Sequence, residues 1–273
     1  MTQHYFEHPE VKLHYYKFGS GEQKMLCFHG FGMHGKQFRA LGPVLGEKYT
    51  FYGFDLFFHE KTKLTDQSLP GVKKGISKKA FARIIEDFCT YEQIERFSVI
   101  GYSMGSHYAT VVTEELGNRV NEYIIVAPAS INPGMLTRFF CKNKIGQKIL
   151  EKVVLSEKAI TGMIKLFKRL RLLDAASRDI LYKEVATEEL RFNFYACFVY
   201  LRFFETDEFQ LIKTLQEQNV RSIFIFANRD RMYPRATGDA FLKKLPHAEV
   251  FVLDENHEMI KQSFVDLLAG LLL

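Results

Sequence analysis

Short apolar runs recur along this chain, with helix-length intervals between them. All but the first are nearly continuous rather than alternating, which is typical of parallel strands buried on both faces of a sheet. The intervals show helical periodicity, so the pattern predicts an α/β protein with a mostly parallel, doubly wound sheet. The expected strands are Val11–Tyr16, Met25–Phe28, Tyr49–Phe54, Phe97–Ile100, Tyr123–Ala127, Ser222–Phe226 and Val250–Leu253. The expected helices between and after them are Lys36–Leu45, Lys78–Tyr91, Ser106–Leu116, Arg235–Leu245 and about Glu258–Leu268.

The long interval between the fifth and sixth of these strands contains helical periods and no convincing strand pair. We therefore predict a core domain, residues 1–132 and 219–273, with a helical cap inserted at residues 133–218. In Thr161–Leu173 the pattern predicts one apolar face and an opposite basic one; these consist of Met163, Leu166, Phe167 and Leu170, and of Lys165, Lys168 and Arg169.

Positive charge is concentrated in the predicted cap. Residues 135–205 contain 14 Lys and Arg against 8 Asp and Glu, a net charge of +6 in a chain whose total is +5. We interpret the basic stripe as the outer face of a lid helix whose apolar face covers a pocket; a helix lying on a membrane surface is the alternative. The aromatic run Phe192–Phe204 is expected to fill the cap and in part to line an apolar acyl site. No nucleic-acid-binding motif accompanies the basic residues, so we expect no nucleic-acid partner.

Composition excludes several other classes of protein. No apolar run approaches the roughly 20 residues that a membrane span needs, so we expect no stable membrane insertion. The first residues do not form a secretion signal, and the expected location is the cytoplasm. The cysteines are far apart, which argues against a zinc site, and no phosphate loop or dinucleotide fingerprint is present, so we expect no metal and no cofactor. These cysteines are Cys27, Cys89, Cys141 and Cys197.

The segment Gly101-Tyr102-Ser103-Met104-Gly105 lies between an expected strand and an expected helix. A serine at the apex of such a turn projects its hydroxyl outward and leaves the following backbone N–H free, both of which a serine nucleophile needs. Glycine flanks the turn because it is too tight for larger side chains.

Two further loops supply a base and an acid at the same edge of the predicted sheet. Asp230 follows the strand that ends at Phe226, and His257 follows the last strand. Ligands of open α/β sheets bind beyond the carboxyl ends of the strands, where these loops lie. After the strand at Met25, the glycines of His29-Gly30-Phe31-Gly32 free the backbone for the Phe31 N–H to point inward.

These segments resemble the α/β-hydrolase superfamily, in its capped serine-hydrolase branch. The order Ser, Asp, His along the chain is the order in that superfamily. The resemblance covers nearly the whole chain apart from the cap and implies about eight strands. It also implies Ser103 as nucleophile, His257 as base and Asp230 as orienting acid, with an oxyanion hole formed by the backbone N–H groups of Phe31 and Met104.

Two points qualify this interpretation. Asp254 and Glu255 are rival candidates for the acid, ranked second because they lie too close in sequence to His257. The segment Asp55–Thr62 has Phe58 and Glu60 where relatives often have glycine. We therefore expect a differently shaped loop at the mouth of the pocket.

The predicted activity is hydrolysis of an ester or thioester of a small, largely hydrophobic acyl substrate. Haloalkane dehalogenases and epoxide hydrolases have aspartate at the turn between strand and helix (the nucleophile elbow), where this chain has Ser103. The chain also contains no tryptophan, so these two reactions are disfavoured. Carbon–carbon bond hydrolysis remains an alternative, because relatives of that kind use the same triad. A non-enzymatic protein that binds or senses a small molecule on the same fold is the alternative from another class.

Overall fold

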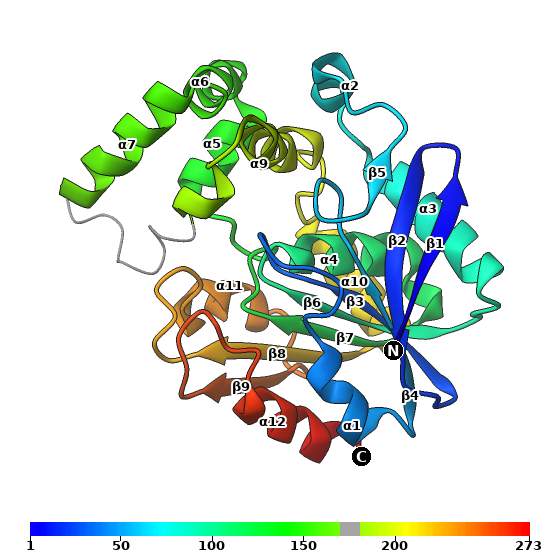
Figure 1. Ribbon diagram of the computed structural model, residues 1–273. Helices are drawn as coiled ribbons and strands as arrows, with labels where there is room; N and C mark the ends of the chain where they lie inside the picture. Colours follow the sequence, from blue (N-terminus) through cyan, green and yellow to red (C-terminus); the bar gives the residue numbers. More distant parts are fainter. Residues whose placement is uncertain (170–180) are drawn as a thin grey trace.

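The computed structural model describes residues 1–169 and 181–273, and within them nine strands form one sheet (Figure 1). The path through the sheet is β1-β2-β4-β3-β6-β7-β8-β9, with β5 paired to β2. The strands are β1 Thr2–His8, β2 Val11–Phe18, β3 Gln23–Phe28, β4 Tyr49–Phe54, β5 Lys63–Leu64, β6 Phe97–Tyr102, β7 Val120–Val126, β8 Arg221–Ala227 and β9 Glu249–Leu253.

The six strands from β4 to β9 on this path are mutually parallel, whereas β1, β2 and β5 pair antiparallel. The predicted α/β class with a mostly parallel sheet is thus confirmed. Two strands were not predicted. β1 lies at the edge of the sheet and is largely exposed, so it lacks an apolar run, and β5 has only two residues.

Helices cover both faces of the sheet, as its sequence pattern predicted. Successive residues of β3 point to opposite faces, so that Phe28 joins one core and Cys27 the other. One face packs against α1 (Gly42–Leu45) and α12 (Gln262–Leu272). The other packs against α3 (Lys78–Tyr91), α4 (Gly105–Leu116), α10 (Glu208–Glu217) and α11 (Asp239–Leu242).

Two predicted helices are shorter than expected. Lys36–Leu45 contains a 3₁₀ turn, Arg39–Leu41, followed by α1, and the break falls at Gly42 and Pro43. Arg235–Leu245 likewise divides into a 3₁₀ turn and α11 at Gly238. Glycine weakens a helix interior and proline cannot donate its backbone hydrogen bond, so neither segment continues as one helix.

The last helix, α12, begins at Gln262 rather than near Glu258. Residues 257–261 form a loop in which the carbonyl of His257 accepts a hydrogen bond from the Met259 N–H. The short helix α2 (Leu69–Lys74) was not predicted, although Ser68 caps it and Pro70 lies in its first turn.

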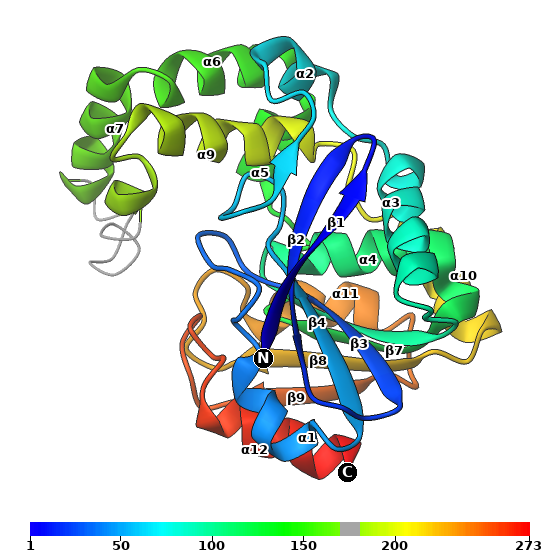
Figure 2. The same ribbon diagram turned by 45° about the vertical axis from the view of Figure 1, so that its right-hand side comes forward.

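The secondary-structure elements described between β7 and β8 are all helices. They are α5 (Met135–Lys142), α6 (Lys144–Val154), α7 (Glu157–Arg169), α9 (Glu188–Tyr200) and α10. The helices α5, α6, α7 and α9 lie beyond the carboxyl ends of the strands (Figures 1 and 2). By contrast, α10 packs against α4 on the face of the sheet. The segment leaves and rejoins the core at one place, where the Thr206 hydroxyl donates to the Ser130 carbonyl at 2.7 Å.

The helix predicted at Thr161–Leu173 corresponds to α7, and its residues after Arg169 lie outside the described ones. Its buried face is centred on Ile160 and Ile164, with Met163 and Phe167 beside them. Leu166 is instead 51% exposed, because the helical repeat places it about a third of a turn away. None of the described helices is long and apolar enough to cross a bilayer.

Candidate active site

Ser103 lies on a strained turn between β6 and α4. Its φ of 50° falls in the left-handed region that few residues other than glycine occupy. A Cβ on Gly105 would lie 2.0 Å from the carbonyl oxygen of Phe28, and one on Gly101 would lie 2.6 Å from the carbonyl oxygen of Gly105. The turn can therefore be this tight only with glycine on both sides of the serine. Surrounding structure holds such strain in place, as is common at functional sites.

The structure brings Ser103, His257 and Asp230 together in a hydrogen-bonded chain. The Ser103 Oγ lies 3.1 Å from His257 Nε2, and His257 Nδ1 lies 2.8 Å from Asp230 Oδ2. An ionised carboxylate only accepts hydrogen bonds, so Nδ1 carries the imidazole proton and Nε2 is free to accept from the serine hydroxyl. This arrangement suits a serine–base–acid triad.

Asp230 is held as an ionised, buried carboxylate. Its side chain is fully buried, and its Oδ1 accepts the backbone N–H groups of Met232 and Tyr233. Burial alone would raise the pKa of Asp230. The hydrogen bond and charge of His257, together with those two N–H groups, lower that pKa below its usual range.

Neither rival acid reaches the imidazole by a hydrogen bond. Asp254 is exposed and pairs with Arg229. Glu255 pairs with Lys261, whose ammonium lies 2.7 Å away, and also accepts the Ser263 hydroxyl. Both carboxylates stabilise the surface of the His257 loop rather than orient the ring.

Tyr102 positions the His257 loop, a role that the sequence analysis did not identify. Its hydroxyl donates to the backbone carbonyl of His257 at 2.7 Å, while its ring and that of Tyr233 lie 5.5 and 5.8 Å from the imidazole. Burial raises the pKa of the Tyr233 hydroxyl to about 12, so this group stays neutral beside the imidazole. The sequence signal that could have identified this role is the position of Tyr102, a large side chain directly before Ser103.

Phe31 and Met104, the predicted oxyanion-hole residues, both line the cavity beside Ser103. Among the contacts between described residues, neither backbone N–H has a protein acceptor. A Cβ added to Gly30 would lie 3.7 Å from the Ser103 Cβ, so the turn containing Phe31 passes directly over the serine. Two free N–H donors beside a nucleophile are what stabilisation of an oxyanion requires.

Neighbouring side chains hold the His29–Gly32 turn in shape. Gln37 accepts the Gly30 N–H, and His59 Nε2 accepts the Gly32 N–H. The buried His29 donates from Nδ1 to the Gly30 carbonyl and accepts the Leu56 N–H on Nε2. Burial lowers the pKa of His29, which keeps its ring neutral in this two-sided role.

The Asp55–Thr62 loop has a left-handed backbone at its two unusual positions. Phe58 and Glu60, which stand where relatives often have glycine, have φ values of 63° and 49°. Both therefore keep the left-handed backbone that glycine adopts without strain. The surrounding contacts hold these larger residues in that conformation, and a loop shaped differently from those of relatives stays a prediction.

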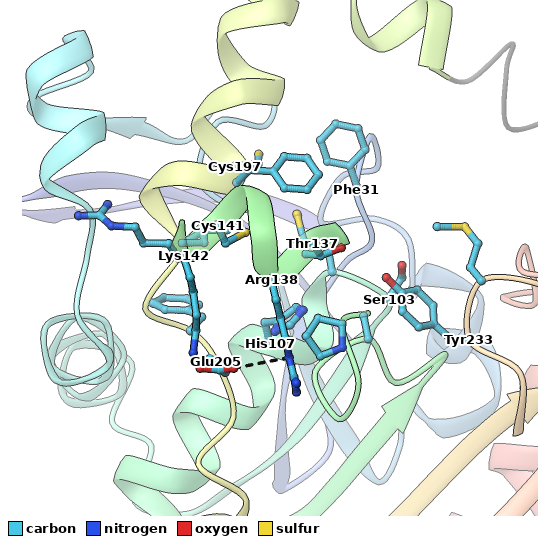
Figure 3. Close-up of a pocket in the computed structure, with 18 of the residues that line it drawn as sticks. Phe31, Ser103, His107, Thr137, Arg138, Cys141, Lys142, Cys197, Glu205 and Tyr233 are labelled. Atoms are coloured by element: carbon cyan, nitrogen blue, oxygen red, sulfur yellow. Dashed lines mark hydrogen bonds and ion pairs between the residues drawn. The ribbon is translucent and has the colours of Figure 1, made fainter. Parts of the chain in front are cut away.

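A cavity of about 360 Å³ opens from Ser103 and extends beneath α5 and α9 (Figure 3). Volumes of this size are typical of small-ligand sites. Its wall is mostly apolar and aromatic, and it includes Phe194 and Phe198 from the aromatic run of α9. The structure thus places an apolar chamber directly against the serine hydroxyl.

The side of the cavity opposite Ser103 in Figure 3 is polar. Arg138 and Lys142 of α5 both pair there with Glu205. Nearby, His107 of α4 lines the cavity, and burial lowers its pKa to about 4. The imidazole of His107 is therefore neutral at physiological pH.

Comparisons with known proteins agree with this architecture. A family model described as the alpha/beta hydrolase fold matches residues 24–143. No curated protein sequence matches the chain. Many solved structures share the fold.

A thioesterase domain from the curacin biosynthetic pathway is 15% identical, covering 99% of this chain and 98% of its own, with a TM-score of 0.66. A carboxylesterase structure from the thaumarchaeon Nitrososphaera gargenis is 15% identical, covering 98% and 97%, with a TM-score of 0.66. A proposed epoxide hydrolase from Pseudomonas aeruginosa is 16% identical, covering 99% and 95%, with a TM-score of 0.65.

At such identities these likenesses bear on the fold alone, and the three relatives are named for different reactions. Two features of the chain itself agree with this fold. These are the strand–turn–helix at Ser103 and the family-model match across that same region. The chain has the α/β-hydrolase fold.

Proposed function

We propose that this protein is a serine hydrolase that cleaves an ester or thioester of a small, largely hydrophobic acyl substrate. The observation that carries the proposal is the continuous hydrogen-bonded chain from Ser103 through His257 to Asp230 at the edge of an apolar cavity. No bound cofactor is needed for this chemistry, because the side chains themselves supply nucleophile, base and orienting acid.

In the acylation step, His257 Nε2 takes the hydroxyl proton as Ser103 Oγ attacks the substrate carbonyl carbon. The carbonyl oxygen becomes an oxyanion facing the N–H groups of Phe31 and Met104. The resulting imidazolium is stabilised by Asp230. The carbon–leaving-group bond then breaks, and the alcohol or thiol departs with the proton from His257.

In the deacylation step, His257 takes a proton from water, and the resulting hydroxide attacks the acyl carbon. The ester bond to Ser103 breaks, and His257 returns the proton to Ser103 Oγ. The carboxylic acid is released and the enzyme regains its starting state.

The cavity favours the acyl part of the substrate as its occupant. Phe31, Phe194 and Phe198 present aromatic surface, which is stabilised by burial of alkyl or aryl groups. The neutral His107 and the Arg138–Glu205 pair lie where the distal end of such a group would reach.

In this proposal the helices between β7 and β8 act as a cap on the core. α9 and α5 supply much of the chamber wall, whereas α10 belongs with the sheet by its packing. The hydrogen bond from Thr206 to Ser130 closes the base of the segment. The functional cap is therefore better bounded at about residues 131–206 than at the predicted 133–218.

A labelling experiment tests the nucleophile. A fluorophosphonate probe should modify the purified protein, and Ser103→Ala should abolish labelling, whereas the exposed control Ser20→Ala should label normally. Undiminished labelling of Ser103→Ala would contradict the assignment.

A substrate panel tests the reaction. p-Nitrophenyl esters and coenzyme A thioesters with acyl chains of increasing length would be compared by kcat/KM, with Ser103→Ala as the blank. Turnover that depends on Ser103 supports the hydrolase. Saturable binding of acyl ligands without turnover would instead support a ligand-binding protein, and cleavage restricted to β-diketones would support a carbon–carbon bond hydrolase.

A further inference from the structure

The outward face of α6 combines lysines with exposed isoleucines. Lys144, Lys148 and Lys152 are four residues apart and form one line along the helix. Ile145 and Ile149 form the next line, and are 66% and 44% exposed. The five side chains occupy a continuous arc of less than half the helix circumference. We call this arc the α6 face.

Packing within the protein does not account for these isoleucines. The opposite side of α6 is buried through Gly146, Leu150 and Val154, which already attach the helix to its neighbours. The lysines lie along one side of the two isoleucines, which therefore form a narrow apolar strip beside a row of positive charges. Such a strip is stabilised only by something outside the described part of the chain.

The charge of the surrounding segment limits what that partner is. Residues 135–169, which contain α5, α6 and α7, have nine Lys and Arg against two Asp and Glu. This net charge of +7 exceeds the +5 of the whole chain, so the remaining residues sum to −2. Two copies of the α6 face would repel each other, and an anionic partner is favoured.

We propose that the α6 face docks on an anionic lipid surface. Helices that lie in the membrane interface have basic residues beside an apolar strip, and lysines near an anionic leaflet add favourable electrostatic energy. A nucleic acid would use the lysines but would leave Ile145 and Ile149 in water. The pairing of charge with aliphatic side chains therefore selects a lipid.

The position of the α6 face suits such a surface. α6 lies with α7 at the end of the molecule farthest from the sheet, in both views (Figures 1 and 2). It packs against α5, whose Arg138 and Lys142 line the cavity. Docking would bring the cavity side of the protein close to the lipid. The proposal concerns this surface alone and does not depend on the proposed hydrolysis.

Vesicle sedimentation tests the electrostatic part. The full chain should co-sediment with phosphatidylcholine vesicles containing about 30% phosphatidylserine, bind pure phosphatidylcholine weakly, and dissociate as salt rises. Lys144→Glu/Lys148→Glu/Lys152→Glu should lower the partition coefficient by at least about 100-fold, since the loss of each lysine near such a surface costs roughly fivefold and each new glutamate adds repulsion. Lys79→Glu/Lys213→Glu/Lys243→Glu changes the net charge equally at exposed sites on the core. This control should retain most of the binding.

Fluorescence tests the apolar part, because the chain has no tryptophan of its own. Ile149→Trp should shift its emission to the blue and be quenched by brominated lipid when anionic vesicles are added. Phe209→Trp, at a 78% exposed site on α10, should not respond. Circular dichroism melting of each variant confirms that it is folded.

Three binding results would each overturn the proposal. These are equal binding of the two charge-reversal variants, an unshifted Ile149→Trp emission at saturating vesicle concentration, and tight binding to single-stranded DNA without binding to anionic vesicles. Concentration-dependent dimerisation through the same side chains would also overturn it, in favour of a second copy of the chain.

Discussion

At the scale of single residues, the hydrogen bond from His257 Nδ1 to Asp230 assigns Asp230 the role of orienting the imidazole. Substitution at Asp230 tests whether this role goes beyond the effect of a nearby negative charge. Asp230→Asn removes the negative charge and offers an N–H toward Nδ1, which favours the tautomer that cannot accept from Ser103. We expect kcat for a p-nitrophenyl ester to fall by about 10³- to 10⁴-fold. The exposed neighbour Asp254→Asn is the control and should stay within about twofold. A small loss in Asp230→Asn would contradict the assigned triad.

Glu60 provides a second test at this scale, through backbone strain. The left-handed conformation costs an ordinary residue about 1–2 kcal/mol, and glycine costs about 0.5–1 kcal/mol in backbone entropy. Glu60→Gly should therefore change the free energy of unfolding by about 0 to +1.5 kcal/mol, measured by urea denaturation. The exposed Glu22, which has no positive φ, is the control, and Glu22→Gly should be destabilising. Equal losses in both variants would show that no strain is relieved at residue 60.

The three residues of the proposed triad could be named from the sequence because each follows an apolar strand, and strand ends are visible in a sequence. Their supporting contacts could not. Tyr102 reaches a carbonyl 155 residues away, and Gln37 accepts an N–H across a turn. Pairings of this kind depend on how loops meet in space. Residue periodicity does not encode them.

At the scale of secondary-structure elements, the elbow depends on close contact between α4 and β3. Gly105→Ala would place a methyl group 2.0 Å from the backbone of Phe28, where nothing flexible can move aside. We expect a loss of about 3 kcal/mol or more in unfolding free energy and loss of fluorophosphonate labelling. Gly162→Ala, on the exposed side of α7 with no atom within 4 Å, is the matched control. It should stabilise by about 0.5–1 kcal/mol, and the idea fails if both variants behave alike.

The junction of α3, α4 and α10 contains a buried carboxylate, Glu114. It pairs with Lys78 and accepts the backbone N–H of Asp207. Burial is the largest influence and raises the pKa of Glu114 to about 7 from an ordinary value of 4.5, against the opposing effect of Lys78. A carboxyl whose pKa is raised by folding binds its proton more tightly in the folded state. Its contribution to stability is therefore present below pH 4.5 and is lost as pH rises through 7.

Glu114→Gln tests this element-scale prediction. Between pH 4.5 and 7 the variant should lose less unfolding free energy than the wild type, by up to about 3 kcal/mol, as measured by denaturation at each pH. The exposed Glu115→Gln on the same helix should follow the wild type. Parallel curves for all three proteins would contradict the raised pKa.

Elements differed in how well the sequence predicted them. Buried strands and long amphipathic helices such as α3 were found, because burial on one or both faces imposes an apolar pattern. The edge strand β1 and the short helix α2 were missed, since little of either is buried. The predicted helices at α1 and α11 were too long because the apolar periodicity crosses the junctions with the preceding 3₁₀ turns, at Gly42 and Gly238, where the α-helical backbone does not.

At the scale of the whole molecule, the chamber between core and inserted helices sets the substrate range. Each methylene buried adds about 0.8 kcal/mol, so kcat/KM should rise by up to about fourfold per carbon until the chamber of about 360 Å³ is filled. Cys141→Phe would occupy the side opposite Ser103. It should therefore lower the preferred acyl length while leaving a short ester unaffected. A length profile that is unchanged in Cys141→Phe would place the acyl group elsewhere.

The bond between Thr206 and Ser130 has one more implication for the molecule as a whole. All three members of the proposed triad lie outside the loop of chain that this bond closes, so the loop behaves as a cassette with a single attachment point. Exchange of that cassette between homologues, by recombination or by design, could retune which molecules enter while the reactive groups stay in register.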